Sequence, residues 1–298
     1  MAKAKWDEMA EKFFEGGCSK GMCYTNYAKA TDKYTVGMAW NGVSGFTDNP
    51  SGADEQASYA DNIKYISLRG AENYGGTIKC FWYPDNFRSC LGKKNPAKSD
   101  STTIKGVTVS QQGRETFGFA VTTQVGNDVD GTEAGETIHL VWNAMTSPSS
   151  KDYSSLNESP SPSELSFEFT ANPVAVGDGT KFKPTANMEI CTAGMDPVED
   201  EAFFSALETL KGILYGIDDA YDLVADANTP ADWGVDEGVY YKKEVNNSYT
   251  DITTITPTPT YAKDTYYKRT PGNDPYLPSP AYIISEVFNG VVDTVPAG

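Results

Sequence analysis

Residues 115–144 read ETFGFAVTTQVGNDVDGTEAGETIHLVWNA, and this stretch decides the expected fold. Glu115–Val125 and Glu136–Ala144 are rich in β-branched and aromatic residues, which favour strands. In the second segment Ile138, Leu140 and Trp142 share one face, because successive side chains of a strand point to opposite sides. The intervening Asn127–Glu133 is rich in Asn, Asp and Gly, a composition typical of turns. The stretch therefore predicts two strands joined by a hairpin turn.

Similar segments recur along the chain. Strands are expected at Lys33–Trp40, Tyr59–Leu68, Gly76–Tyr83, Thr103–Val109, Glu164–Asn172 and Thr185–Cys191. The strands are separated by about eight to fifteen residues that contain Gly, Pro or Asn, which argues for an antiparallel sheet rather than βαβ units. The expected fold class is therefore mainly β: an antiparallel β-sandwich or barrel with one flanking α-helix.

That helix is expected at residues 197–215. Asp196 can cap it, Pro197 suits the first helical position, and Glu199 completes a capping box. Phe203, Leu207, Leu210 and Leu214 then form one apolar stripe that can pack on a sheet. Gly216 ends the helix. A second, short helix is expected at Ala281–Phe288.

Two polar segments lack a strand or helix pattern. Residues 1–33 are rich in Gly and charge, and are expected to form an arm that orders against a partner. Gly42–Ser58 contains Gly, Pro, Asp, Asn and Ser with few apolar residues, and is expected to be a long loop. Long loops in compact domains are usually functional.

The composition changes after the helix. Residues 217–274 are rich in Thr, Tyr, Asp and Pro, and Val239–Lys243 is echoed by Thr265–Arg269. This segment is expected to be an inserted surface module of three or four strands. The expected domain organisation is a β-sandwich domain over 1–216 with its N-terminal arm, the insertion over 217–274, and a segment over 275–298 that returns to the first domain.

The chain is strongly acidic. It has 24 basic and 41 acidic residues, a net charge of −17, which opposes binding of nucleic acid through a broad phosphate-contacting surface. The charged N-terminus lacks the apolar core of a signal peptide, and no apolar run approaches the ~18 residues of a membrane-spanning helix. Five cysteines with no zinc-site spacing are expected to be reduced thiols, so the protein is expected to be made in a cytoplasm.

Seven short motifs occur in a fixed order, and together they identify a family. They are Ala39-Trp40-Asn41-Gly42, Tyr59-Ala60-Asp61-Asn62-Ile63-Lys64-Tyr65, Tyr83-Pro84-Asp85-Asn86-Phe87, Gln111-Gln112-Gly113-Arg114-Glu115-Thr116-Phe117-Gly118-Phe119, Val125-Gly126-Asn127-Asp128, Ile213-Leu214-Tyr215-Gly216 and Pro275-Tyr276-Leu277-Pro278-Ser279-Pro280. The series resembles the major tail protein of long-tailed, non-contractile bacteriophages, the subunit of the tail tube. The resemblance covers roughly residues 1–216 and 275–289.

The resemblance implies a structural protein and not an enzyme. It implies the tail-tube fold, with six copies forming a ring and rings stacking into a tube through which DNA is ejected without specific binding. The expected location is the virion tail, assembled in the host cytoplasm. Tape measure, tail tip and tail terminator proteins are the expected partners, with no membrane, cofactor or metal.

The resemblance also suggests which residues act in assembly. Contacts between rings or subunits are expected from the Trp40 motif, the loop and the following strand, namely Trp40, Asn41, Gly42, Asp48, Pro50, Asp54, Glu55, Tyr59, Asp61 and Asn62. Acidic residues facing the lumen are expected among Asp128, Asp130, Glu133 and Glu136. Deleting Gly45–Ala57 is expected to leave folded subunits that cannot stack.

Other functions stay open. Tyr240, Tyr241, Tyr266 and Tyr267 of the insertion could serve a carbohydrate-binding or adhesive module, although aromatic cross-strand pairs are more often a module's core. Carboxylate pairs such as Asp54 with Glu55, or Glu133 with Glu136, could serve glycoside hydrolysis.

Two further features have a simple structural interpretation beside a functional one. His139, the only histidine, is expected to be structural, and the acidic turn at 127–133 departs from a calcium loop at both ends. The basic cluster Arg88, Lys93, Lys94, Lys98 and Lys105 is expected to be either a solvated loop or a partner for an acidic patch on a neighbouring subunit.

Overall fold

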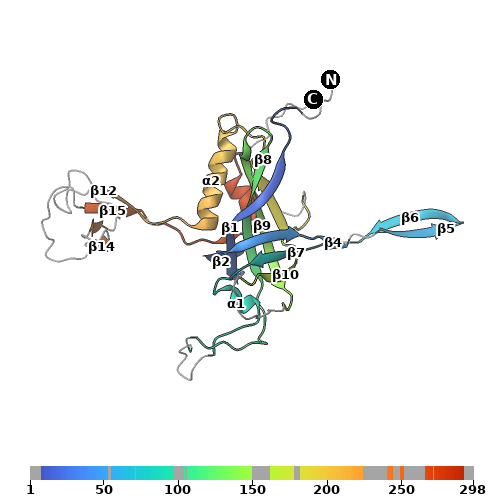
Figure 1. Ribbon diagram of the computed structural model, residues 1–298, viewed down its shortest axis with the longest axis horizontal. Coiled ribbons are helices and arrows are strands. Elements are labelled where there is room, and N and C mark those ends of the chain that lie inside the picture. Colours follow the sequence, from blue (N-terminus) through green and yellow to red (C-terminus); the bar gives the residue numbers. More distant parts are fainter. Residues whose placement is uncertain are drawn as a thin grey trace, which may run out of the picture. The chain divides into compact units, whose positions relative to one another are not determined.

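The computed structural model describes residues 8–52, 55–70, 72–96, 104, 106–149, 162–177, 182–223, 240–243, 249–251, 266–270 and 272–291. The chain divides into two compact units, Met1–Tyr215 with Pro275–Gly298, and Gly216–Asp274. The protein is mainly β with few helices, and its named strands pair antiparallel, so the expected fold class is confirmed at this level (Figure 1). The architecture is consistent with a β-sandwich.

One large sheet organises the first unit. Its strands follow the order β16 (Leu277–Pro278), β2 (Lys33–Ala39), β1 (Phe14–Ala28), β8 (Phe117–Asn127), β9 (Gly131–Thr146), β10 (Leu165–Ala171), β7 (Glu72–Cys80) and β3 (Val43–Asp48). In addition, β11 (Asn187–Cys191) pairs with β9, and β4 (Ser51–Gly52) pairs with β7.

The hairpin expected from residues 115–144 is the centre of this sheet. β8 and β9 pair from Phe117↔Ala144 to Asn127↔Gly131, with the turn at residues 128–130. Asn143 has a φ of 50°, and the register shifts between Phe117 and Phe119, so β9 carries a bulge there. The turn expected at 127–133 is thus shorter than predicted, because β9 already begins at Gly131.

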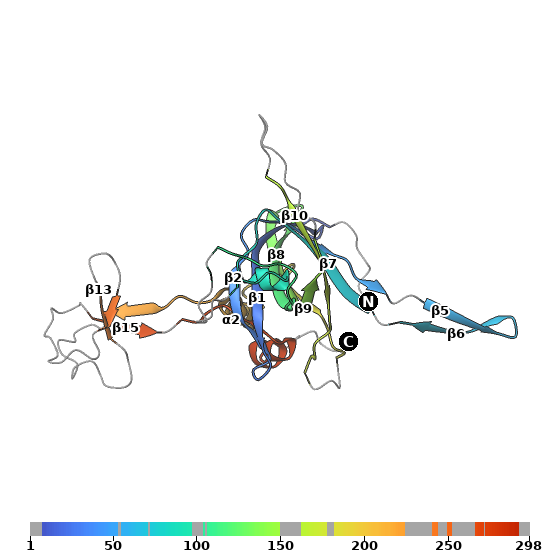
Figure 2. The same ribbon diagram turned by 90° about the horizontal axis from the view of Figure 1, so that it is seen from below.

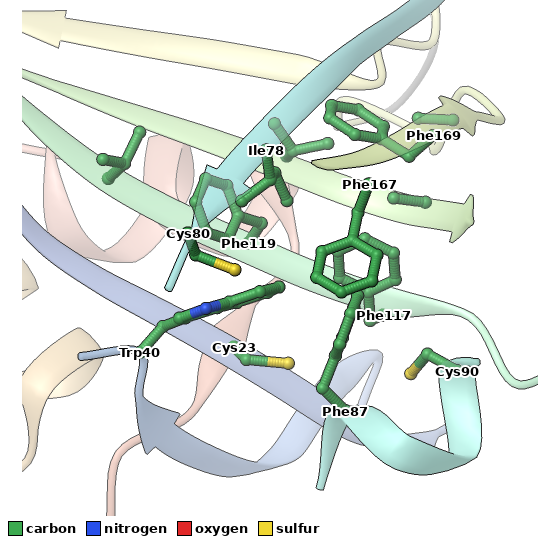
Figure 3. Close-up of a cluster of buried hydrophobic side chains, with 14 of the residues drawn as sticks. Cys23, Trp40, Ile78, Cys80, Phe87, Cys90, Phe117, Phe119, Phe167 and Phe169 are labelled. Atoms are coloured by element: carbon green, nitrogen blue, oxygen red, sulfur yellow. The ribbon is translucent and has the colours of Figure 1, made fainter. Parts of the chain in front are cut away.

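Side chains from alternate positions of these strands fill two cores. Phe119, Val121 and Val141 enter a core that also contains Trp40, Phe87 and Phe167 (Figure 3). Trp40 is the largest side chain there, and its Nε1 donates to the carbonyl oxygen of Trp82 at 2.8 Å.

The opposite face of the sheet is covered by helix α2 (Glu201–Tyr215). Leu207, Leu210 and Leu214 are buried against Ile138 and Leu140, as the apolar stripe predicts. Figures 1 and 2 show α2 beside β1, away from β7 and β10. The helix begins later than expected, because Asp196 Oδ1 accepts the backbone N–H groups of residues 198 and 199 and closes a separate turn.

The C-terminal segment completes this second core. Trp142 Nε1 donates to the carbonyl oxygen of Pro278 at 2.8 Å, and Leu277 is fully buried. Ser279 caps α3 (Pro280–Tyr282), which continues as a π-helical turn, η2 (Ile283–Val287). The helix expected at Ala281–Phe288 is therefore present as these two short elements.

Three expectations of irregular or extended structure are wrong. The arm expected at 1–33 contains the 15-residue strand β1, which lies between β2 and β8. Its glycines and two register shifts, between Gly16 and Met22, hid the strand pattern. The loop expected at 42–58 contains β3, β4 and most of β5 (Glu55–Ala60). The described residues of the segment 103–109 do not form the expected strand. Val109 forms an isolated bridge to Lys94.

The short helix α1 (Phe87–Cys90) was not expected. It follows Asp85 and Asn86, and its Phe87 and Cys90 are buried in the first core. A four-residue helix leaves too short a pattern to be recognised from periodicity.

The second unit holds a four-stranded antiparallel sheet. Its order is β12 (Ala220–Leu223), β15 (Tyr266–Thr270), β13 (Tyr240–Lys243) and β14 (Tyr249–Asp251). The two echoed Tyr-Tyr segments are neighbours in it, with Tyr241 opposite Tyr267.

Candidate functional site

A separate β-hairpin stands out as the candidate assembly element. β5 pairs with β6 (Ile63–Arg69) from Glu55↔Arg69 to Ala60↔Ile63 (Figure 2). These two strands form a sheet of their own. The single strand expected at Tyr59–Leu68 is therefore wrong: Asp61 and Asn62 have φ values of 53° and 62°, and both residues in the left-handed region make a tight hairpin turn.

Polar contacts within the hairpin hold its two strands in register. The Lys64 ammonium and the Ser67 hydroxyl both donate to Glu55 Oε1 across the pair. The hydrogen bond from Lys64, and to a smaller extent that from Ser67, lowers the pKa of Glu55 below its ordinary value. These groups are exposed to solvent, so the contacts specify register more than they stabilise the fold.

The hairpin exposes large apolar side chains. Tyr59 is 70% exposed, Ile63 68%, Tyr65 78% and Leu68 60%. An isolated two-stranded hairpin is marginally stable in water, and it gains stability when an apolar face packs against something else. The hairpin therefore has the composition of a surface that another molecule covers.

Nine of the ten expected contact residues divide into three groups. Glu55, Tyr59, Asp61 and Asn62 lie on the hairpin and are exposed. Asn41 and Gly42 precede β3, Asp48 is its last residue and Pro50 follows it. All four are exposed. Asp54 lies outside the described residues.

The assignment of Trp40 to a contact between subunits needs correction. Its side chain is only 2% exposed and packs between Phe87 and Phe119, with ring centroids 4.4 and 5.6 Å away. A ring enclosed in this way stabilises the subunit and cannot reach a neighbour. The position of Trp40 in its motif, Ala39–Gly42, is therefore interpreted as a core position and not as an interface.

The acidic residues expected in a lumen have different surroundings. Asp128 Oδ1 accepts the backbone N–H of Ala10 at 3.0 Å, and Asp130 Oδ2 accepts the Asn127 side-chain amide at 2.9 Å. Glu133 is exposed on β9.

The charge of Glu136 is compensated by two lysines. Its carboxylate lies 2.6 Å from Lys211 Nζ and 3.6 Å from Lys20 Nζ. Burial opposes ionisation of Glu136, but the hydrogen bond and charge of Lys211 outweigh it, and the pKa is lowered. Glu136 therefore contributes little free negative charge to any surface.

His139 has structural contacts. Its Nε2 lies 2.9 Å from Thr123 Oγ1 and 3.1 Å from Glu15 Oε1, and its Nδ1 lies 3.5 Å from Glu189 Oε1. The hydrogen bond from Thr123, followed by that with His139, lowers the pKa of Glu15. These groups link β1, β8, β9 and β11, as expected of a structural histidine.

In each carboxylate pair considered for glycoside hydrolysis, one member forms an ion pair with a lysine; Asp54, the partner of Glu55, lies outside the described residues. Glu55 is engaged by Lys64, and Glu136 by Lys211. Within the described part of the chain, no group of three His, Cys, Asp or Glu side chains could hold a metal ion.

Cysteines and tyrosines complete the candidates. Cys23, Cys80 and Cys90 are buried thiols, and burial raises the pKa of Cys80 to about 11 and of Cys90 to about 12, which makes them unreactive. Tyr240, Tyr241, Tyr266 and Tyr267 lie on paired strands, Tyr240 opposite Lys268 and Tyr266 opposite Lys242. Their side chains lie outside the described part of the structure, so a carbohydrate-binding role for them stays a prediction.

Comparison with models of known protein families gave no match, and comparison with curated protein sequences gave none either. Among the described residues, no helix has the length and apolar character needed to cross a membrane.

Proposed function

We propose that this protein is a structural subunit that assembles with copies of itself into stacked rings, forming the tail tube of a bacteriophage virion. The observation that carries the proposal is the β5–β6 hairpin, a two-stranded sheet of its own among the described residues, whose large apolar side chains are exposed. The order of the seven motifs supports the choice of the tail tube among possible assemblies.

The rest of the subunit fits this function. Two filled cores make the β-sandwich a rigid unit, which a subunit that bears load in a particle needs. A net charge of −17 per chain, multiplied over a ring, opposes adhesion of DNA to the wall of a tube. The fold proposed is the tail-tube fold, and the activity is assembly rather than catalysis.

Sedimentation velocity of the full chain over a range of concentrations tests the proposal. We expect the 32.3 kDa monomer to give way to a species of about 194 kDa, the mass of six copies, and then to much larger particles. A variant lacking Glu55–Arg69, closed by a short Gly-Ser linker, should remain folded and lose the larger particles. A wild-type chain that stays at 32.3 kDa at every concentration would contradict the proposal.

A further inference from the structure

The two ends of the central hairpin differ in charge. At one end lie the β8–β9 turn, the segment before α2 and the chain at residues 8–13, which contacts the turn through Ala10. The segment before α2 lies close to Phe13 at Gly194: a Cβ atom added to Gly194 would lie 3.8 Å from the Phe13 ring. We call this surface the acidic end; it comprises residues 8–13, 127–133 and 195–201.

The acidic end carries nine acidic residues and one lysine, a net charge of −8. Lys12, the single basic residue, lies 3.5 Å from Asp128. Apolar side chains stand among these charges: Val198 is 85% exposed, and Met9 and Val129 are also exposed. An apolar centre with a charged rim is the usual anatomy of a protein interface.

The other end of the same strands has the opposite sign. β8 is 11 residues long, so its ends are roughly 35 Å apart. Near Phe117, two hydrogen bonds join the end of the hairpin to the segment around α1. The backbone N–H of Glu115 donates to the carbonyl oxygen of Ser89, and Thr146 Oγ1 donates to the carbonyl oxygen of Cys90. We call the surface formed around α1, residues 82–96 and 106–115, the basic end.

The basic end contains a groove of about 400 Å³ lined by Arg88, Lys93 and Lys94 together with Asp85 and Glu115. The basic end as defined, residues 82–96 and 106–115, has four basic and two acidic side chains, a net charge of +2 in a chain whose total is −17. Lys98, Asp100 and Lys105 lie outside the described residues and are left out of this count.

The two carboxylates of this groove already have basic partners: Arg88 lies 3.0 Å from Asp85, and Lys94 lies 2.9 Å from Glu115. Lys93 lines the same groove and forms no ion pair among the described residues, so its ammonium can meet a carboxylate of a neighbouring copy.

Exposed apolar side chains also accompany the basic end. Trp82 is 59% exposed and stacks on Tyr83, with ring centroids 5.7 Å apart, while Lys93 lies over the Tyr83 ring. Val109, which bridges to Lys94, is exposed as well.

We infer that the acidic end of one copy docks on the basic end of the next, so that subunits join head to tail along the direction of β8. Two acidic ends repel each other, so the contact joins different surfaces of identical chains. A heterologous contact of this kind leaves one free end of each type and produces an open stack. The inference rests on the proposed function, and it assigns Asp128, Asp130 and Glu133 to an axial contact in place of a lumen.

Charge reversal at each end, alone and in mixture, tests this pairing. One variant carries Glu8→Lys, Glu11→Lys, Glu133→Lys, Glu199→Lys and Glu201→Lys, which changes the net charge of the acidic end from −8 to +2. Another carries Lys93→Glu and Lys94→Glu, which changes the net charge of the basic end from +2 to −2. The matched control carries Lys79→Glu and Lys183→Glu, two exposed lysines outside both ends. Thermal unfolding first establishes that each variant folds, and sedimentation with electron microscopy at low salt then measures stacking.

We expect each end variant alone to need at least about tenfold more protein to stack, because like charges then face each other. The equimolar mixture should stack again, because every contact in an alternating stack joins opposite charges, and the control should stack like the wild type. End variants that stack as readily as the control, or a mixture that does not stack, would overturn the inference. If the wild-type chain still stacks in that experiment, the proposed function stands. A wild-type chain that forms no particles would overturn both.

Discussion

Polar substitution of the β5–β6 hairpin should weaken assembly strongly without unfolding the subunit. The variant Tyr59→Ser, Ile63→Thr, Tyr65→Ser and Leu68→Thr keeps the Asp61-Asn62 turn and the Glu55 contacts, and its four positions are 60 to 78% exposed in the free subunit. Because so little of these side chains is buried, the free energy of unfolding should change by less than about 1 kcal/mol.

The effect on assembly follows from the same exposed fractions. Full burial of a large apolar side chain contributes about 1.5–3 kcal/mol, so burying the remaining two thirds of four such side chains contributes roughly 4–8 kcal/mol per subunit. Only part of such burial appears as binding free energy. If half is realised, the association constant falls by roughly thirtyfold to a thousandfold, at about 1.4 kcal/mol per tenfold change.

The assay is the concentration at which pelletable particles first appear, compared with the thermal unfolding midpoint of the same samples. Lys79→Glu, on the sandwich, serves as a surface control. An unchanged threshold for the hairpin variant, with an unchanged midpoint, would refute the argument that the exposed apolar side chains are covered on assembly.

Three further predictions concern stability and the insertion. Leu210→Ala should lower the free energy of unfolding by about 2–5 kcal/mol, because the side chain is fully buried, whereas Val198→Ala should have little effect in chemical denaturation. The pKa of Glu15 is lower in the folded state, so its contribution to stability is present above the ordinary carboxyl pKa and is lost as pH falls through the folded value. Glu15→Gln should therefore flatten this part of the curve of unfolding free energy against pH. An unchanged curve would contradict this prediction. Deleting Pro230–Thr270 should leave assembly intact, and loss of particles from a folded deletion variant would show that the second unit takes part.

The structure changes one experiment that the sequence suggests. Deleting Gly45–Ala57 would remove most of β3, which pairs with β7, together with Phe46, which packs against the first core. Such a variant would lose stability and assembly together. The separate hairpin Glu55–Arg69 is the segment whose removal spares the large sheet.

Periodicity predicted the parts of the fold where burial is regular. The β8–β9 hairpin and the Leu207, Leu210 and Leu214 stripe were predictable because each repeats its buried positions at the period of its element. The composition change at residue 217 lies beside the division between the compact units at Gly216.

Other parts depended on distant partners. β1 is a central strand, yet glycines and register shifts between Gly16 and Met22 remove its alternation, and its pairing with β8 spans about a hundred residues. The burial of Trp40 depends on Phe87 and Phe119, which local patterns cannot place. The Asp61-Asn62 turn was the one local signal that could have revealed the exposed hairpin.

Negative-stain electron microscopy of the purified full chain, from dilute to concentrated samples, tests the central claim most directly. The account predicts hollow tubes or six-fold rings that become longer or more numerous with concentration. Single particles of monomer size at every concentration, from a chain shown to be folded, would contradict it.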